Sequence, residues 1–299
     1  TTYLRVACFM MPGALCFVVL RGFVAAHGET SVVLWITLVC VVVNAALDYV
    51  LMFGHFGAPR LELAGAGLAT AAVHSLMCLL LLGYALRARR YRRYALLGRF
   101  FRADWRLFGR LFLLGAPIGL TMAAESGLFA AAALLMGWLG ETPLAAHAVA
   151  LQLAAIAFMT PLGLSHATTV RVGLRYGSAD AAGVRAAGWA SVSLALCFMS
   201  LTALVFWFAP EPLVRLFLPA GDPATAAPAA LAVSFLAVAA VFQLFDGAQV
   251  TAAAALRGLG DTATPMAIAL LGYWGVGMPV AYLLAFPLGF GGVGVWTGL

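Results

Sequence analysis

Eight long apolar stretches constrain this chain more than any other feature. They fall approximately at 4–26, 32–54, 63–86, 108–137, 143–166, 187–209, 228–255 and 264–287. A ninth begins near Gly291 and stops with the sequence. The hydrocarbon core of a bilayer is about 30 Å thick, and roughly 20 apolar residues of helix cross it. The sequence therefore predicts an all-α membrane protein, a polytopic bundle of about eight complete transmembrane helices and a truncated ninth.

Composition excludes a soluble globular protein. Apolar residues make up 64% of the 299 residues and charged residues only 9%, whereas about a quarter of the residues in soluble domains are charged. The net charge of +6 is thinly spread, so it does not indicate nucleic-acid binding. The useful question is where the basic residues lie relative to the apolar stretches.

The arginines predict how the helices are oriented. All 17 basic residues are Arg, and 14 of them follow the first, third, fifth or seventh span; Arg5, Arg60 and Arg215 lie on the opposite side. Because cytoplasmic loops carry an excess of basic residues, we expect the loops after spans 1, 3, 5 and 7 to be cytoplasmic. We expect the segment Asp104 to Leu114 to lie flat as an interfacial helix. A topology anchor is the favoured interpretation of this segment, and a dedicated anionic-lipid site is the alternative.

A short pattern recurs about 232 residues apart along the chain. The matched pairs are Arg21-Gly-Phe with Arg257-Gly-Leu, Gly28-Glu-Thr with Gly260-Asp-Thr, and Gly65-Ala-Gly with Gly292-Val-Gly. Chance recurrence in a glycine-rich chain is the alternative, but the matches occur in one order and on one side of the membrane. The period covers six spans, an even number, so the two repeats would be parallel, as in transporters whose pathway lies between two halves.

The repeat predicts a two-lobe protein of twelve helices, of which roughly three are missing at the start of this chain and most of one at the end. Residues 1–86 would hold the last three helices of the N-terminal lobe. Residues 87–107 would form a basic cytoplasmic linker, and residues 108–299 the C-terminal lobe with its last helix truncated.

Three carboxylates lie inside the predicted spans and are the candidates for function. Asp48 lies in the second half of span two, Glu125 near the middle of span four and Asp246 deep in span seven. An ionised side chain at membrane depth costs at least about 2.5 to 3.5 kcal/mol, so it normally faces a polar cavity or a partner. A neutral structural carboxyl is the alternative, and it is strongest for Asp48 because that residue lies near the membrane surface.

Each of these acids has polar neighbours three or four residues away, on its own face of the helix. The neighbours are Asn44 for Asp48, Thr121 for Glu125, and Gln243 and Gln249 for Asp246. A carboxylate with neutral partners can bind a monovalent cation or a proton, because removal from water favours its neutral form. The spacing therefore predicts coupling-ion sites, with Na⁺ or H⁺ at Glu125 and Asp246 and the two glutamines in support.

Familiar catalytic motifs are missing from the sequence. There is no HExxH or GxSxG, and a Walker-type ATP site is impossible without Lys. The five cysteines lie singly in apolar stretches, which is typical of packing residues rather than metal ligands. We therefore expect no enzyme and no cofactor other than a coupling ion.

Seen together, these residues resemble the multidrug and toxic compound extrusion (MATE) family, in particular its bacterial NorM-like branch. The matching segments are Arg21-Gly-Phe with Gly28-Glu-Thr30, Asn44-Ala-Ala-Leu-Asp48-Tyr49 leading to Gly54, Gly65-Ala-Gly-Leu-Ala-Thr70, Ala116-Pro-Ile-Gly119 with Glu125-Ser-Gly127, Val172-Gly173 with Tyr176-Gly177, and Phe242-Gln-Leu-Phe-Asp246 leading to Leu256-Arg-Gly258 and Asp261-Thr262. Each segment is short, but their order and spacing together cover essentially the whole chain.

The resemblance implies twelve helices in two lobes and a secondary antiporter that exports cationic lipophilic drugs in exchange for Na⁺ or H⁺. Glu125 and Asp246 would be the carboxylates of the second lobe that bind the coupling ion and the drug. Asn44 and Asp48, with Thr70, would form part of a cation site in the first lobe, completed by an Asp on a helix before residue 1. We expect a monomer in the bacterial inner membrane, with cationic drugs and the bilayer as its partners.

Two other classes stay open. A lipid-linked oligosaccharide flippase or polysaccharide exporter of related fold would line its cavity with basic residues, whereas almost no Arg lies inside a predicted span. An intramembrane lipid-modifying enzyme would need clustered acids or histidines at a membrane face, and the loops show none.

Overall fold

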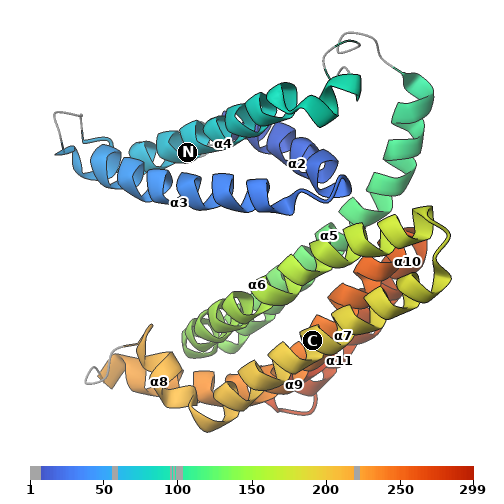
Figure 1. The fold of residues 1–299 in the computed structure, drawn as a ribbon. Helices are drawn as coiled ribbons and strands as arrows, with labels where there is room; N and C mark the ends of the chain where they lie inside the picture. The colour runs from blue at the N-terminus through green and yellow to red at the C-terminus, as the bar shows by residue number, and fades with distance from the viewer. Residues whose placement is uncertain (1–7, 56–59, 95, 97, 99–103, 219–222) are drawn as a thin grey trace. The chain divides into compact units, whose positions relative to one another are not determined.

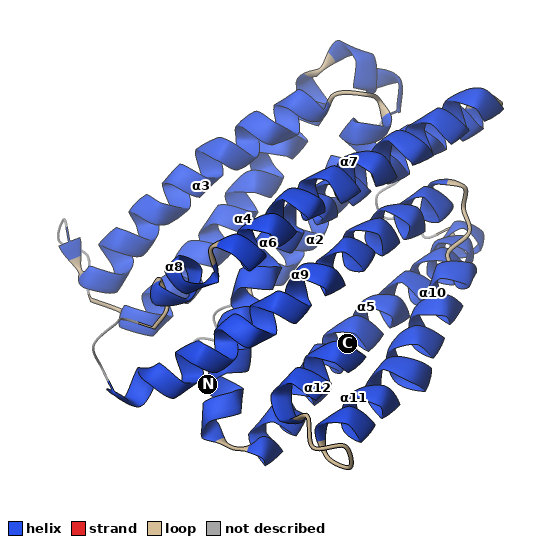
Figure 2. Cartoon of the chain, turned by 90° about the horizontal axis from the view of Figure 1, so that it is seen from below, coloured by secondary structure: helices blue, strands red, loops and turns tan. Residues whose placement is uncertain are grey.

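The computed structural model describes residues 8–55, 60–94, 96, 98, 104–218 and 223–299 of the chain. Over these residues, the secondary structure consists of helices joined by turns and short loops, with no strand (Figure 2). The chain divides into two compact units, Thr1–Ala103 and Asp104–Leu299. Each unit has its own buried core, so each is described by itself.

The described residues of the first unit form three long helices and one short one: α2 (Met10–Ala26), α3 (Thr30–Phe53), α4 (Glu62–Arg87) and the 3₁₀ helix η2 (Arg89–Tyr94) (Figure 1). Helix α4 packs against both α2 and α3. Gly54 ends α3 in the left-handed conformation, with φ 74°, which a residue without Cβ adopts at little cost. The buried core of this unit comes from α2, α4 and η2 and includes Phe17, Leu81 and Tyr91.

A glycine allows α3 and α4 to approach closely. A methyl group built on Gly65 of α4 would lie 2.6 Å from the carbonyl oxygen of Leu51 in α3, well inside an ordinary van der Waals contact. The backbones therefore meet at a point where any side chain would push them apart. This contact sets how the helix that carries Asp48 packs against the helix that carries Thr70.

Nine helical segments are formed by residues 104–218 and 223–299 of the second unit: α5 (Trp105–Leu139), α6 (Glu141–Gly177), α7 (Ala181–Phe208), α8 (Pro210–Arg215), α9 (Pro223–Gly258), α10 (Ala263–Leu270), the π-helix η3 (Leu271–Gly277), α11 (Met278–Ala285) and α12 (Gly291–Gly298). Helices α6, α7 and α9 pack side by side (Figure 1). Helix α5 packs against α6 and α10. The buried core lies around α9 and includes Met136, Phe235 and Trp296.

The prediction of an all-helical membrane protein is confirmed. Seven helical segments among the described residues are long and apolar enough to cross a membrane. They correspond to the second to eighth expected spans. The first expected span, 4–26, appears as α2, whose 17 described residues are shorter than a span. Residues 4–7 of that expected span lie outside the described residues.

Several helices extend beyond the apolar stretches that predicted them. Helix α6 runs for 37 residues, to Gly177, although its apolar stretch was expected to end near residue 166. The additional turns carry Arg171 and Arg175, both exposed, and α-helix continues there because no proline or helix-ending glycine interrupts it. Hydropathy detects only the part of a helix that suits lipid, so it underestimates helices that project past the bilayer.

The segment Asp104 to Leu114 is not a separate helix, contrary to expectation. It forms the first turns of the continuous helix α5. The side chain of Asp104 caps this helix by accepting hydrogen bonds from the backbone N–H groups of Arg106 (3.1 Å) and Leu107 (3.0 Å). The helix then continues without interruption, through Pro117, to Leu139.

Candidate functional site

Glu125 on α5 and Asp246 on α9 lie near one another in the second unit. Their carboxyl groups are close enough to interact electrostatically, and both side chains are partly buried. A contact one turn away fixes this register: the rings of Phe129 and Phe242 meet edge to face with centroids 6.4 Å apart. Phe129 lies four residues after Glu125 and Phe242 four residues before Asp246. The structure therefore brings the two predicted carboxylates near one another, one turn from an aromatic pair.

The π-helix η3 supplies a third wall of this site. Tyr273 accepts a hydrogen bond at its hydroxyl from the side-chain amide of Gln249. Trp274 donates its indole N–H to the carbonyl oxygen of Ala124 (3.1 Å), the residue before Glu125. The Tyr273 hydroxyl also lies in the neighbourhood of both carboxylates. Short π-helical stretches often occur at functional sites, because the wider turn re-aims its side chains.

Arg257 is a cation close enough to Glu125 to act on it electrostatically. It lies in the last turn of α9, is partly buried, and attracts the Glu125 carboxylate electrostatically. Its Nε is buried and has no hydrogen-bond partner among the described residues. From the sequence, Arg257 was placed in a loop after span seven. The structure puts it on the same helix as Asp246, because α9 continues three residues beyond its apolar stretch.

The two glutamines that flank Asp246 have different surroundings. Gln249 is exposed and bonded to Tyr273, so it joins the carboxylate site. Gln243 is only 2% exposed, and its amide atoms have no partner among the described residues. It continues the buried stripe of Leu236 and Ala240 on α9. The two glutamines, both expected to support Asp246, are therefore divided between the site and the core.

Thr121 does not hydrogen-bond to Glu125, although it lies one turn before it. Its hydroxyl donates to the carbonyl oxygen of Pro117 at 2.8 Å, within the same helix. Threonine commonly makes this bond to the residue four positions earlier. The groups that act on Glu125 electrostatically, Arg257, Asp246 and Tyr273, are on other helices.

The candidate residues of the first unit lie on one helix hairpin. Asn44 and Asp48 are on α3 and Thr70 is on the adjacent α4. The Oδ1 atom of Asp48 is buried without a hydrogen-bond partner among the described residues. The Thr70 hydroxyl donates to the carbonyl oxygen of Ala66 (2.8 Å). Within the described part of this unit, no hydrogen bond joins the three side chains.

Sequence reasoning missed Tyr273, Trp274 and the role of Arg257. Two signals could have found the aromatic pair: both side chains carry a polar atom, and Gly272 and Gly275 flank them inside an apolar span. No group of three or more His, Cys, Asp or Glu side chains in the described part of the chain is placed to hold a metal ion. The carboxylate site consists of two acids, a phenol, an amide and one arginine: Glu125, Asp246, Tyr273, Gln249 and Arg257.

These features define a polytopic helical membrane protein with ionisable groups gathered between its spanning helices, which is the construction of ion and substrate pathways. Comparison with known families agrees. The family model MatE matches residues 1–50 and 117–283. The chain belongs to the MATE family, which confirms the resemblance seen in its sequence; the family comprises transporters and not enzymes.

Individual relatives support this membership. The chain is 48% identical over 283 residues to the probable multidrug resistance protein NorM of Mesorhizobium japonicum, covering 95% of the chain and 61% of that protein. It is 47% identical over 296 residues to the protein of the same name from Rhizobium meliloti, covering 99% and 63%. The chain therefore spans less than two thirds of the length of these relatives.

Solved structures show the same fold. A multidrug resistance MATE family transporter of the MOP superfamily, in an outward-facing conformation, superimposes with a TM-score of 0.86 at 19% identity, over 99% of this chain and 64% of that one. The eukaryotic MATE transporter AtDTX14 gives a TM-score of 0.84 at 20% identity, over 98% and 64%. The arrangement of helices is thus that of part of a MATE transporter.

Proposed function

We propose that this chain is part of a NorM-type antiporter that exports cationic lipophilic drugs across the bacterial inner membrane in exchange for Na⁺ or H⁺. The observation that carries the proposal is the pairing of Glu125 with Asp246 between spanning helices. The similarity to proteins named as multidrug resistance proteins supports the direction and substrate class. Two acids near one another, with neutral polar neighbours, suit a monovalent cation or a proton as the coupling ion.

The carboxylate pair can couple two fluxes through competition. Two negative charges close together in a poorly solvated site repel one another, so the site gains free energy when a cation or proton enters it. A cationic drug relieves the same repulsion and therefore competes with the coupling ion. Each occupant favours the conformation in which it binds best, and alternating occupancy then drives alternating access.

The neighbouring residues act on this competition. Arg257 offsets part of the negative charge at Glu125, so one monovalent cation is enough to neutralise the pair. Tyr273 offers a hydroxyl, and its bond to Gln249 holds that group toward the carboxylates. Phe129 and Phe242 provide an apolar, aromatic boundary suited to a lipophilic cation.

The chain would contribute the last three helices of the N-terminal lobe (1–86), a linker (87–107) and most of the C-terminal lobe (108–299). In this arrangement Asn44, Asp48 and Thr70 belong to a cation site of the first lobe, for which the buried Oδ1 of Asp48 is an available acceptor. The distribution of arginines supports cytoplasmic loops after spans 1, 3, 5 and 7. We propose that the transporter works as a monomer.

The test uses inverted membrane vesicles that hold the full-length transporter. Transport of a lipophilic cationic dye is measured under an imposed Na⁺ gradient alone and then under a pH gradient alone. We expect Glu125→Gln and Asp246→Asn to abolish ion-driven transport at unchanged expression. Glu141→Gln, which alters an exposed acid at the start of α6, is the matched control and should transport normally. Ion-driven transport retained by both site variants would refute the assignment.

A further inference from the structure

A strongly basic turn follows α4 directly. We call Arg87–Tyr94 the basic turn; it holds five arginines and two tyrosines in eight residues. Arg90 pairs with Glu29. The other four are exposed and form no ion pair among the described residues: Arg87, Arg89, Arg92 and Arg93. The turn therefore presents four uncompensated positive charges.

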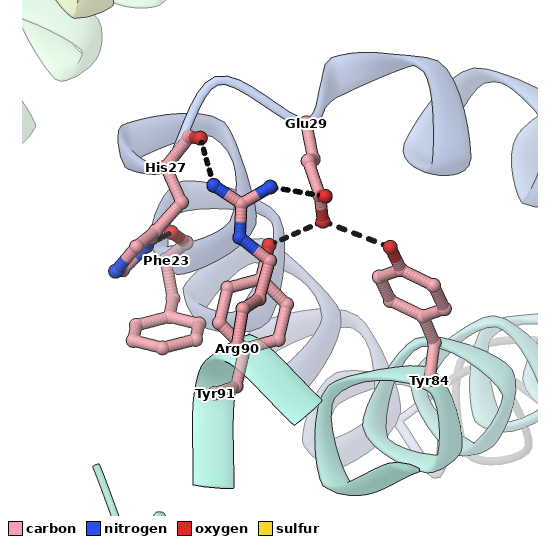
Figure 3. A network of polar contacts seen from close by, with 6 residues as sticks. All are labelled: Phe23, His27, Glu29, Tyr84, Arg90 and Tyr91. Carbon is pink, nitrogen blue, oxygen red and sulfur yellow. Dashed lines mark hydrogen bonds and ion pairs between the residues drawn. The ribbon is translucent and has the colours of Figure 1, made fainter. Parts of the chain in front are cut away.

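Glu29 holds this turn in place (Figure 3). One oxygen of its carboxylate accepts hydrogen bonds from the hydroxyls of Tyr84 (2.8 Å) and Tyr91 (2.6 Å), and the other accepts from Arg90. Arg90 also donates to the backbone carbonyl of His27 at 3.3 Å. These donors, the Tyr91 hydroxyl foremost, lower the pKa of Glu29 to about 2. The carboxylate is therefore charged at any physiological pH. We call Glu29 and its donors Tyr84, Arg90 and Tyr91 the Glu29 network.

An aromatic cluster anchors the same turn. Tyr91 is only 1% exposed, and its ring meets the ring of Phe23 edge to face at 5.2 Å. The guanidinium of Arg93 lies over the ring of Tyr94, 4.9 Å from its centroid. Both contacts restrict the backbone from which the exposed arginines project. Less backbone entropy is then lost when those arginines bind a ligand.

The position of the turn points to its ligand. Helix α4 is a membrane-length apolar helix that ends at Arg87, so the basic turn begins at the depth of the lipid headgroups. Arginine binds phosphate oxygens through paired N–H groups, and tyrosine is typical of the membrane interface. A topology signal needs only the charge, which an irregular loop would supply equally well. A topology signal does not explain the Glu29 network, which neutralises one of the five arginines.

We propose that the basic turn binds the phosphate groups of anionic phospholipids in the surrounding bilayer. The ligand is a phosphodiester headgroup with net negative charge, as in phosphatidylglycerol, and the four unpaired arginines contact it. Glu29 does not contact the lipid; it positions the arginines through Arg90, Tyr84 and Tyr91. This inference does not depend on which ion or drug the protein transports.

The test measures lipid binding by native mass spectrometry of the full-length protein in a non-ionic detergent, titrated with phosphatidylglycerol or phosphatidylcholine. The site variant replaces Arg89, Arg92 and Arg93 by Gln. The control variant replaces Arg106, Arg171 and Arg185 by Gln and so removes the same charge from other exposed positions. Each arginine near an anionic surface contributes about 1 kcal/mol, or about fivefold in affinity. We expect the site variant to lose phosphatidylglycerol affinity of the order of 100-fold, and the control variant to lose much less.

Several results would overturn the proposal. Equal losses in both triple variants would show that only net charge matters, and no loss in the site variant would remove the basic turn from lipid binding. Displacement of the lipid by an equal concentration of inorganic phosphate would identify free phosphate as the ligand, and displacement by a short RNA would identify nucleic acid. A further measurement needs no variant: the preference of the wild-type protein for phosphatidylglycerol should weaken as salt is added, and a salt-independent preference would contradict the charge-based site.

Discussion

Replacing Gly65 by Ala tests the close contact between α3 and α4. The added methyl carbon would lie 2.6 Å from the Leu51 carbonyl oxygen, whereas ordinary contact begins at 3.4 Å. The helices must therefore separate by about 0.8 Å at this point, and the backbone hydrogen bond from Leu61 to the same oxygen (3.0 Å) is disturbed. Overpacking of this kind costs about 1 to 3 kcal/mol. Alanine is better than glycine in a helix by about 1 kcal/mol, which offsets part of that cost.

Gly83→Ala separates the two effects, because Gly83 lies on the same helix and a methyl group there meets nothing within 4 Å. Both variants gain the same helix propensity, so their difference in stability isolates the steric cost, about 1 to 3 kcal/mol. The assay is thermal unfolding of the full-length protein in detergent, followed by intrinsic fluorescence. Gly65→Ala should unfold several degrees below Gly83→Ala. Equal midpoints would refute the close packing of this hairpin.

Three further outcomes follow from the structure. Trp274→Phe removes an indole hydrogen bond beside the carboxylate pair and should slow ion-driven transport. Trp207→Phe removes a similar bond to a backbone carbonyl elsewhere and should leave the transport rate unchanged. Equal transport rates in the two variants would contradict a role for η3. Leu236→Ala, at a fully buried position, should destabilise the protein by about 2 to 5 kcal/mol, whereas Leu201→Ala, at a position 60% exposed, should change the unfolding midpoint little. The pKa of Glu29 is lowered from 4.5 to about 2, so its stabilising effect is complete above pH 4.5 and is lost as the pH falls toward 2. The difference in unfolding midpoint between wild type and Glu29→Gln should therefore shrink over that range. A constant difference would rule out stabilisation by the charged Glu29 carboxylate.

The sequence by itself determined the helices and the candidate acids. A segment in lipid must satisfy its own backbone hydrogen bonds, so a sufficiently long apolar stretch has to be helical whatever it packs against. The cost of a charge at membrane depth is likewise a property of one position. Glu125 and Asp246 could therefore be singled out without any knowledge of their neighbours. The ends of α6 and α9 could not, because hydropathy does not register turns that leave the bilayer.

Only the tertiary structure decided which polar groups meet. The rotation of α9 puts Gln249 beside the carboxylates and Gln243 in the core, although both lie three residues from Asp246. The π-helix brings Tyr273 to the site, and its wider turn leaves no mark on hydropathy. In the first unit, Glu29 looks like an ordinary loop acid until the fold brings Tyr84 and Tyr91 to it. Which side chain on another helix becomes the partner of a polar residue depends on how the two helices rotate and cross. Side-chain packing sets those angles only when the helices come together.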